Sequence, residues 1–376
     1  MEKITTIVIT GAQGFVGKNL FATLQNRPDI RVIAIDRKSS ITQLEDAIKQ
    51  ADIIYHLAGV NRPQDPQEFM QGNFNYSESI INLLAKHHSQ AKLVVSSSIQ
   101  AENNNPYGLS KKAMEDAFIH HAKKTQQPLF IYRLVNVFGK WAKPHYNSVI
   151  ATFCYAISRG EPIQIHDENA PIRMIYIDDL VEEFISILTK KEPTLGTFLS
   201  VQPEYGMTVG ELAKTLQQFH HHRQKLVLET QANPLIKKLY ATYLSYLDTN
   251  NFAYELTMHH DARGSFTELI KSLQEGQISV NISKPGITKG NHYHHTKNEK
   301  FIVVSGQASI KFRKVGTSNV IEYRVDGDHM RVVDIPPGYT HNITNIGEHD
   351  LVTIMWASEF FDPQRPDTYP MEVDVQ

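Results

Sequence analysis

The pattern of apolar residues changes once along this chain, and that change most restricts the folds open to it. Up to about residue 190, short β-branched runs alternate with longer stretches in which apolar residues recur at helical spacing. This alternation is typical of βαβ units and predicts a doubly wound parallel sheet. The runs expected to form its strands are Thr6–Thr10, Val32–Ile35, Ile53–His56, Leu93–Ser96 and Phe130–Arg133.

The second part of the chain follows the segment Asp248–Asn251. Its strand-like runs are separated by Gly, Pro and Asn turns without a helical period, which predicts an all-β sandwich or barrel. Upstream, Thr208 and Glu211 have the spacing of a capping box that opens a helix. We predict two domains, residues 1–250 and 251–376. The all-β runs are Gln277–Ile282, Lys300–Val304, Ala308–Phe312 and Leu351–Trp356.

Composition excludes several classes of protein. A formal net charge of −2 gives no electrostatic reason to expect a nucleic-acid or membrane partner. No apolar run approaches the roughly 20 residues that a membrane helix needs. The single cysteine, Cys154, cannot form an internal disulfide, and the first residues show no signal-peptide pattern. We therefore expect a cytoplasmic protein.

A glycine-rich loop links the first predicted strand to the first helix. Gly11, Gly14 and Gly17 follow the strand directly, which is the context of a dinucleotide-binding loop in a Rossmann-like domain. Glycines permit a tight turn close to a pyrophosphate, and the helix N-terminus offers N–H groups to it. The third strand should end beside the same cofactor, although His56 there is expected to be a structural residue. The expected cofactor contacts in these segments are Gly11, Gly14, Phe15, Val16, Gly17, His56 and Ala58.

The end of the second predicted strand gives conflicting signals about the cofactor. Asp36 stands where an acid normally accepts from the adenosine ribose hydroxyls, which favours NAD. Arg37 and Lys38 follow, and their charges suit a 2′-phosphate, although a solvated turn explains them equally well.

A tyrosine and a lysine are spaced for acid–base chemistry. Tyr107 and Lys111 are four residues apart and therefore share one helical face. A neighbouring ammonium makes proton exchange by a phenol practicable near neutral pH. Both Tyr107 and Lys111 should also contact the cofactor. Among the serines that end the preceding strand, we prefer Ser98 to Ser97 as the residue that orients a substrate carbonyl.

Together with His56-Leu-Ala-Gly59 and the segment Arg133–Gly139, these motifs resemble the extended short-chain dehydrogenase/reductases that act on nucleotide sugars. The resemblance implies that Asn136 contacts the sugar nucleotide, and Arg173 fits the same role less specifically. Dehydratases of that family carry an Asp-Glu pair after the strand-end hydroxyl. Here Ile99 and Gln100 follow Ser98, which favours a reductase or epimerase.

The all-β part contains a histidine-rich candidate metal site. His292 and His294 lie two residues apart on a strand and so face the same way, with Glu299 across a turn and His341 after a Pro-Gly turn. Three imidazoles and a carboxylate suit zinc, and also iron, manganese or nickel. These segments match both motifs of the cupin superfamily, which implies a jelly-roll barrel. The segment around Arg263 is similar to the opening strand of cupin sugar epimerases, in which that arginine contacts the nucleotide sugar.

Nearly the whole chain resembles a family of bifunctional capsular-polysaccharide enzymes of the UDP-N-acetyl-L-fucosamine pathway. The resemblance implies C3 epimerisation of a UDP-2-acetamido-2,6-dideoxy-4-hexulose by the cupin and then NADPH reduction at C4, giving a UDP-2-acetamido-2,6-dideoxy-L-talose. It also implies zinc and a homodimer; NADH stays open because of Asp36. Three alternatives remain: a 4-keto reductase whose cupin is only a dimerisation or ligand-binding module, a redox-sensing binding protein, and an iron cupin oxygenase. A cupin that has lost its metal also remains open.

Overall fold

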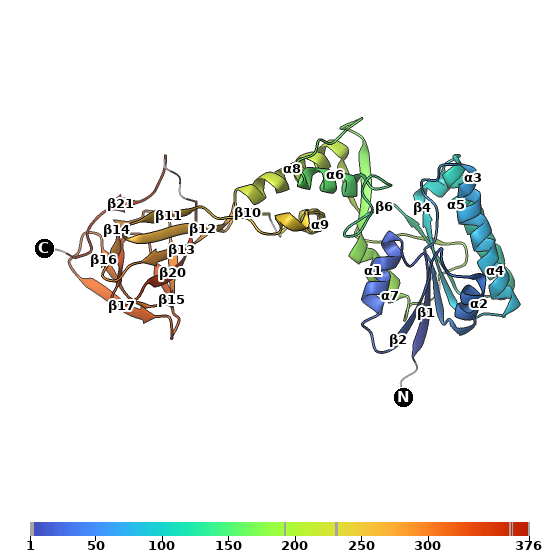
Figure 1. Cartoon of the computed structure of the whole chain (residues 1–376), viewed down its shortest axis with the longest axis horizontal. Coiled ribbons are helices and arrows are strands. Elements are labelled where there is room, and N and C mark those ends of the chain that lie inside the picture. Colours follow the sequence, from blue (N-terminus) through green and yellow to red (C-terminus); the bar gives the residue numbers. More distant parts are fainter. Residues whose placement is uncertain (1–3, 192, 230–231, 361, 363, 375–376) are drawn as a thin grey trace. The chain divides into compact units, whose positions relative to one another are not determined.

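The computed structural model describes residues 4–191, 193–229, 232–360, 362 and 364–374. Within the described residues, no helix combines the length and the apolar character needed to cross a membrane. The chain forms two compact units, one comprising residues 1–217 with 237–248 and the other residues 218–236 with 249–376. Their elements are labelled in Figure 1.

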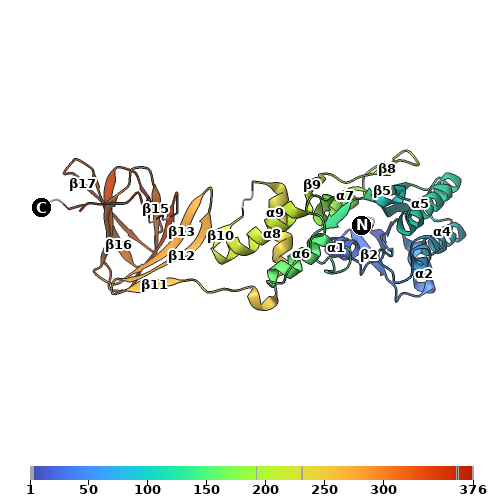
Figure 2. The ribbon, with the colours of Figure 1, turned by 90° about the horizontal axis from the view of Figure 1, so that it is seen from above.

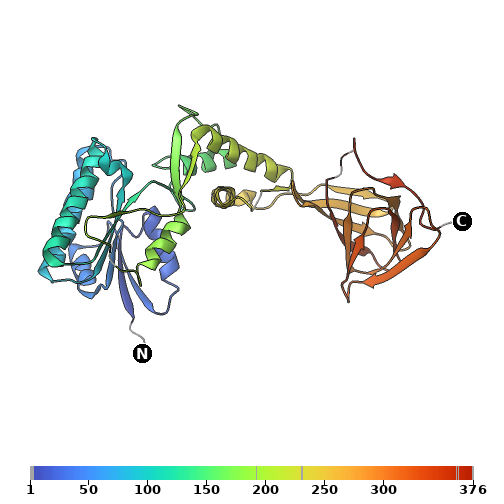
Figure 3. The same ribbon diagram turned by 180° about the vertical axis from the view of Figure 1, so that it is seen from behind.

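The first unit is built on a six-stranded sheet in the order β2-β1-β3-β4-β5-β8, in which every neighbouring pair is parallel. Helices cover both of its faces (Figure 3). Its strands are β1 (Thr5–Thr10), β2 (Ile30–Ile35), β3 (Ile53–His56), β4 (Lys92–Ser98), β5 (Leu129–Leu134) and β8 (Phe198–Leu199). The doubly wound parallel sheet predicted from the sequence is therefore confirmed.

Alternation along each strand divides the core of this unit in two. On β1, Ile7 and Ile9 pack into one apolar cluster and Val8 into the other, because successive side chains point to opposite faces. The first cluster is closed by α1 (Phe15–Leu24) and α7 (Ile177–Ser186). The second is closed by α2 (Ile41–Gln50), α4 (Tyr76–Lys86) and α5 (Pro106–Thr125). Strands buried on both faces account for the unbroken apolar runs in the sequence.

The strand order of this sheet reverses direction at β1, because after β2 the chain returns to the opposite side of β1 to form β3. Such a switch point, at the carboxyl ends of the strands, is where doubly wound sheets bind ligands. The glycine loop follows β1 directly.

A smaller sheet and three helices complete the first unit and lead into the second. The sheet has the order β6-β7-β9, with β6 and β7 parallel and β7 and β9 antiparallel. Helices α8 and α9 each cross from one compact unit to the other. These elements are β6 (Asn136–Phe138), β7 (Pro171–Tyr176), β9 (Tyr205–Thr208), α6 (Val149–Ser158), α8 (Val209–Gln224) and α9 (Pro234–Leu244).

The second unit consists of two sheets that enclose one apolar core (Figure 2). One sheet has the order β10-β12-β13-β20-β15-β18 with β11 beside β12, and the other has the order β17-β16-β19-β14-β21. The first sheet contains β10 (Val227–Leu228), β11 (Met258–Asp261), β12 (Gly264–Ser272), β13 (Gly276–Ser283), β15 (Glu299–Ser305), β18 (Val332–Ile335) and β20 (Leu351–Ala357). The second contains β14 (Thr288–Tyr293), β16 (Gln307–Lys314), β17 (Val320–Asp326), β19 (Tyr339–Asn345) and β21 (Tyr369–Pro370).

The core between these sheets takes residues from both. Phe301, Val303 and Leu351 come from one sheet, and Ile310 and Ile343 from the other. The predicted all-β cupin architecture is confirmed.

Candidate active sites

The glycine loop of the first unit is packed so tightly that side chains would not fit. A Cβ on Gly11, whose φ is +70°, would lie 2.7 Å from the backbone N and Cα atoms of Ala58 after β3. A Cβ on Gly17 would lie 2.2 Å from the Gly11 carbonyl oxygen. The loops after β1 and β3 are therefore in contact, and α1 starts directly against the loop.

The first turn of α1 has backbone N–H groups that are not used within the helix. Gly14 is the N-cap and has no side chain to cap the helix; the Lys18 N–H donates to its carbonyl at 2.9 Å. The amides of Phe15, Val16 and Gly17 precede that bond and so have no acceptor within the helix. N–H groups without an acceptor in the helix, at its positive end and beside glycine residues, fit the pyrophosphate of a dinucleotide.

The turn after β2 lies beside the glycine loop, since the Ala12 N–H donates to the Ile35 carbonyl at 3.2 Å. The Asp36 carboxylate shapes this turn by accepting from the Lys38 N–H at 2.7 Å. Arg37 and Lys38 are exposed. The acid and the two cations that gave conflicting signals in the sequence thus share one turn.

His56 has a structural role in the candidate site. Its Nδ1 lies 2.8 Å from the Thr10 hydroxyl and its Nε2 lies 2.8 Å from the Ser77 hydroxyl, so both ring nitrogens are engaged. Burial, with the charge of Lys111 nearby, lowers the pKa of His56 to about 3. The ring is therefore neutral at physiological pH, and only the backbone of His56 is left to meet a cofactor.

Tyr107, Lys111 and Ser98 meet at the carboxyl end of β4. Asn105 caps α5 by accepting from the Gly108 N–H at 2.8 Å, which sets Tyr107 in the first turn. Burial raises the pKa of the Tyr107 phenol, and the neighbouring Ser98 side chain offsets part of that rise. One turn later the buried Lys111 donates from Nζ to the Ser96 carbonyl at 3.1 Å, and burial lowers its pKa to about 8.

The two serines before the turn are used differently. The Ser97 hydroxyl donates to Glu115 at 2.5 Å inside the protein. Arg133 also donates to Glu115, from Nε at 3.0 Å and from Nη2 at 2.8 Å. Ser98 is the serine beside the Tyr107 phenol. Glu115 was missed in the sequence, although it lies four residues after Lys111 and so shares its helical face.

Asn136 and Arg173 lie side by side on the small sheet. The Asn136 amide donates to the Arg173 carbonyl at 3.0 Å, and the exposed Arg173 guanidinium pairs with Glu204. The structure therefore brings these two predicted substrate contacts together, with the guanidinium held by a carboxylate. Tyr146 was not predicted at all, yet it is near enough to Tyr107 to contribute to raising its pKa.

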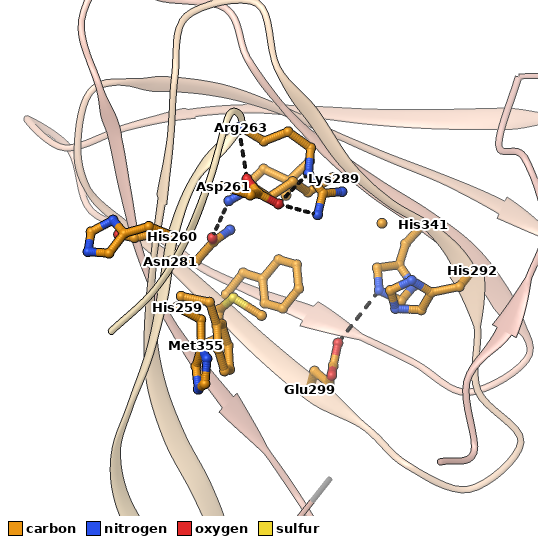
Figure 4. A pocket seen from close by; sticks show the side chains of 15 residues that line it. His259, His260, Asp261, Arg263, Asn281, Lys289, His292, Glu299, His341 and Met355 are labelled. Carbon is orange, nitrogen blue, oxygen red and sulfur yellow. Dashed lines mark hydrogen bonds and ion pairs between the residues drawn. The ribbon is translucent and has the colours of Figure 1, made fainter. Parts of the chain in front are cut away.

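In the second unit, the four predicted metal ligands converge. His292 is the penultimate residue of β14 and lies opposite His341 of β19, His294 follows β14, and Glu299 begins β15. Their candidate ligand atoms all lie within 4.8 Å of one another. Glu299 Oε2 is 3.5 Å from His294 Nε2 and 3.6 Å from His341 Nε2. Figure 4 shows Glu299 facing His341.

The chemistry of this cluster fits a divalent cation. The Nε2 atoms of His294 and His341 are buried without a hydrogen-bond partner. Burial and the other two imidazoles lower the pKa of His292 to about 4. Burial alone would raise the pKa of Glu299, but the adjacent imidazoles of His294 and His341 hold it well below the usual range. Neutral imidazoles around a carboxylate are the ligand forms that zinc and similar metals bind.

Three of the four cluster residues, His292, Glu299 and His341, line a cavity of about 350 Å³. Arg263 lines the same cavity, where Nε and Nη2 contact Asp261 Oδ2 at 2.9 and 2.6 Å. Lys289 was not predicted; its Nζ donates to Asn281 Oδ1 at 2.7 Å and to the Ile282 carbonyl at 3.0 Å. Figure 4 shows these cations across the cavity from His292 and His341. His259 and His260 also line it.

Known protein families match both parts of the chain. Residues 7–197 match the NAD dependent epimerase/dehydratase family, and residues 259–369 match the polysaccharide biosynthesis C-terminal domain. The chain is 43% identical to UDP-2-acetamido-2,6-beta-L-arabino-hexul-4-ose reductase of Pseudomonas aeruginosa over 98% of each protein.

Solved structures extend the similarity to the whole fold. The chain matches the capsular polysaccharide assembling protein CapF from Staphylococcus aureus with a TM-score of 0.92 and 49% identity, covering 98% of this chain and 100% of that one. CapF with the inhibitor 3-isopropenyl-tropolone matches with a TM-score of 0.88 and 45% identity over the same shares. The family implies a nicotinamide cofactor. The chain therefore belongs to the NAD dependent epimerase/dehydratase family and, along nearly its whole length, to the CapF-type enzymes in which that domain is followed by a polysaccharide biosynthesis C-terminal domain.

Proposed function

We propose that this chain performs two successive reactions on a UDP-linked 4-keto amino sugar. The second unit epimerises C3 of a UDP-2-acetamido-2,6-dideoxy-4-hexulose, and the first unit then reduces C4 to give a UDP-2-acetamido-2,6-dideoxy-L-talose. The observation that carries the proposal is the convergence of Ser98, Tyr107 and the buried Lys111 at the carboxyl end of β4. The 43% identical relative supports it, because its name describes a reductase of a hexul-4-ose.

The reductive half follows from the state of these three side chains. NADPH bound at the glycine loop would supply the hydride for C4. Tyr107 donates its proton to the C4 oxygen, and its raised pKa keeps the phenol protonated at neutral pH. Ser98 lies beside the same phenol and orients the carbonyl. Lys111 stabilises the phenolate that remains after the proton is given up.

The epimerase half uses the cavity of the second unit. His292, His294, Glu299 and His341 would hold Zn²⁺, which stabilises negative charge on a carbonyl oxygen. The 4-keto group acidifies the neighbouring C3–H, so the same carbonyl serves both reactions. Arg263 and Lys289 supply positive charge for the UDP diphosphate. His259 and His260 line the same cavity and are available for proton transfer at C3.

NADPH is our proposed cofactor, and the turn after β2 supports it. One oxygen of Asp36 is already bonded to the Lys38 amide, while the Arg37 and Lys38 side chains are exposed beside the glycine loop. Positive charge at this position suits a 2′-phosphate. We further propose, from the family resemblance, that the enzyme works as a cytoplasmic homodimer.

The test uses the full chain loaded with zinc and the UDP-4-keto sugar in deuterated water, at first without nicotinamide. We expect proton NMR to show deuterium entering C3, and NADPH added afterwards to be oxidised with formation of the C4 alcohol. The same assay with NADH measures the cofactor preference. If C3 did not exchange while the metal site was full, the chain would be a 4-keto reductase whose cupin is a dimerisation or ligand-binding module. Reduction without prior exchange would identify the same alternative.

A further inference from the structure

The end of the chain is fastened to the strand and loop that carry two of the four metal-site residues. In β21, Pro370 pairs with His292 and Tyr369 with Tyr293 of β14, in antiparallel register. The Met371 N–H extends this contact by donating to the Asn291 carbonyl at 2.8 Å. Residues 366–371 therefore run beside His292 and reach the loop 294–297, which begins with His294.

Asp367 binds that loop with its side chain. Oδ1 accepts from the His295 N–H at 3.0 Å, and Oδ2 accepts from the N–H groups of Thr296 at 2.9 Å and Lys297 at 2.8 Å. The Thr296 hydroxyl donates to the same Oδ2 at 3.0 Å. One carboxylate thus fixes three consecutive backbone amides, which only an acceptor without N–H groups of its own can do.

The backbone of Asp367 holds the ligand itself. Its carbonyl accepts from His294 Nδ1 at 2.6 Å. Asp367 has φ of +37°, in the left-handed region that aspartate and asparagine tolerate better than most residues. From the loop side, Lys297 Nζ donates to the Pro366 carbonyl at 3.2 Å and contacts the Thr368 hydroxyl at 3.0 Å, so both neighbours of Asp367 are braced.

This contact decides which nitrogen of His294 can bind a metal. A carbonyl only accepts, so Nδ1 must carry the proton, and the lone pair of a neutral imidazole is then left on Nε2. Nε2 is buried without a hydrogen-bond partner and lies 3.5 Å from Glu299 Oε2. The tail therefore fixes both the tautomer and the direction of His294 in the geometry that ligation needs.

We propose that Asp367 is a positioning residue of the metal site: its carboxylate anchors the loop 294–297 while its carbonyl holds His294 with Nε2 towards Glu299. The proposal rests on the metal site of the proposed function and adds the C-terminal segment 366–371 to that site. Partners that orient a metal-bound histidine commonly account for 10- to 100-fold in metal affinity.

The test compares zinc affinity of the full-length wild type and Asp367→Asn by competition with a chromophoric chelator. Asparagine keeps the shape and tolerates the left-handed φ, but its amide N–H groups face the backbone donors that the carboxylate accepted. We expect zinc to bind roughly 10- to 100-fold more weakly and to be removed faster by EDTA. The matched control is Asp374→Asn, which removes an exposed contact to Lys311 at 3.1 Å on the same tail and should leave zinc affinity unchanged.

A second variant covers the case in which Asp367→Asn does not fold. Lys297→Met removes the brace on Pro366 and Thr368 but keeps the carboxylate, and should weaken zinc binding by a smaller factor. Folding of each metal-free variant is checked by circular dichroism and thermal unfolding. Wild-type affinity in a folded Asp367→Asn chain, or in Lys297→Met where the first does not fold, would overturn the role of Asp367. Zinc binding by neither variant nor wild type would instead overturn the metal site itself.

Discussion

At the scale of single residues, Lys111 places a positive charge where water cannot reach it. The side chain is 4% exposed, Nζ donates to one carbonyl at 3.1 Å, and burial lowers its pKa from 10.5 to about 8. Because the pKa is lower in the folded chain, unfolding takes up a proton between about pH 8 and 10.5, and the free energy of unfolding rises with pH across that window. At neutral pH the buried charge costs on the order of 3 kcal/mol.

Replacing this ammonium with a neutral chain of similar length separates stability from activity. We expect Lys111→Met to raise the free energy of unfolding of the first unit by about 1–3 kcal/mol at pH 7, with a smaller gain at pH 9.5. Reduction should slow by about 10²- to 10⁴-fold, because Tyr107 loses the charge that stabilises its phenolate. Calorimetry at both pH values and NADPH oxidation measure the two effects. A loss of stability at pH 7 would show that the bond to Ser96 outweighs the cost of burial.

At the scale of elements, the features that could be predicted best are those whose sequence pattern lies within one segment. The strand runs up to β5 and in the second unit, and the capping box at Thr208 and Glu211, are confirmed. Pairings between distant segments were not predicted, such as the parallel contact of β10 with β12 that places residues 218–236 in the second unit. Likewise, no local pattern indicates that Asp367 reaches His294, because 73 positions separate them and only the folded sheet brings them together. The roles of the candidate site residues remain predictions.

His56 shows how elements of the first unit are tied beneath the candidate site. It joins the end of β3 to Thr10 of β1 and to Ser77 of α4, and its pKa is lowered to about 3 mainly by burial. The folded chain therefore leaves it neutral where the unfolded chain protonates it, below about pH 6.5. The free energy of unfolding should fall as the pH drops from 6.5 towards 3, by about 2 kcal/mol at pH 5 from this residue alone.

His56→Leu tests this tie. At pH 7.5 the variant loses two buried hydrogen bonds and should be less stable than wild type by about 1–3 kcal/mol. At pH 5 the difference should shrink by about 2 kcal/mol, because protonation of His56 in the unfolded chain lowers the free energy of unfolding of the wild type but not of the variant. Urea unfolding of the first unit at the two pH values gives the comparison. A difference independent of pH would mean that His56 is protonated in the folded chain.

At the scale of the whole molecule, each unit has its own core and its own candidate site. Among the residues that the structure describes, the two clusters around the parallel sheet contain none from the barrel, and the buried barrel core comes from β15–β20. Tyr107 and His341 therefore belong to separately packed structures, so a change at one site should leave the chemistry at the other intact. A UDP sugar released by one unit is chemically the substrate of the other under the proposed order of reactions.

Mixing two inactive chains tests that independence. Tyr107→Phe should still exchange the C3 proton of the UDP-4-keto sugar but not oxidise NADPH, since the phenol that protonates the C4 oxygen is gone. His341→Ala should lose the exchange through its weakened metal site, yet reduce sugar that has already been epimerised. Mixed in equal amounts, the two variants should restore overall conversion after a lag, because the 4-keto intermediate has to diffuse from one chain to the other. NMR in deuterated water with NADPH follows both steps at once. If each variant alone is confirmed as described and the mixture still stays inactive, the intermediate is not released, and transfer must occur within one assembly.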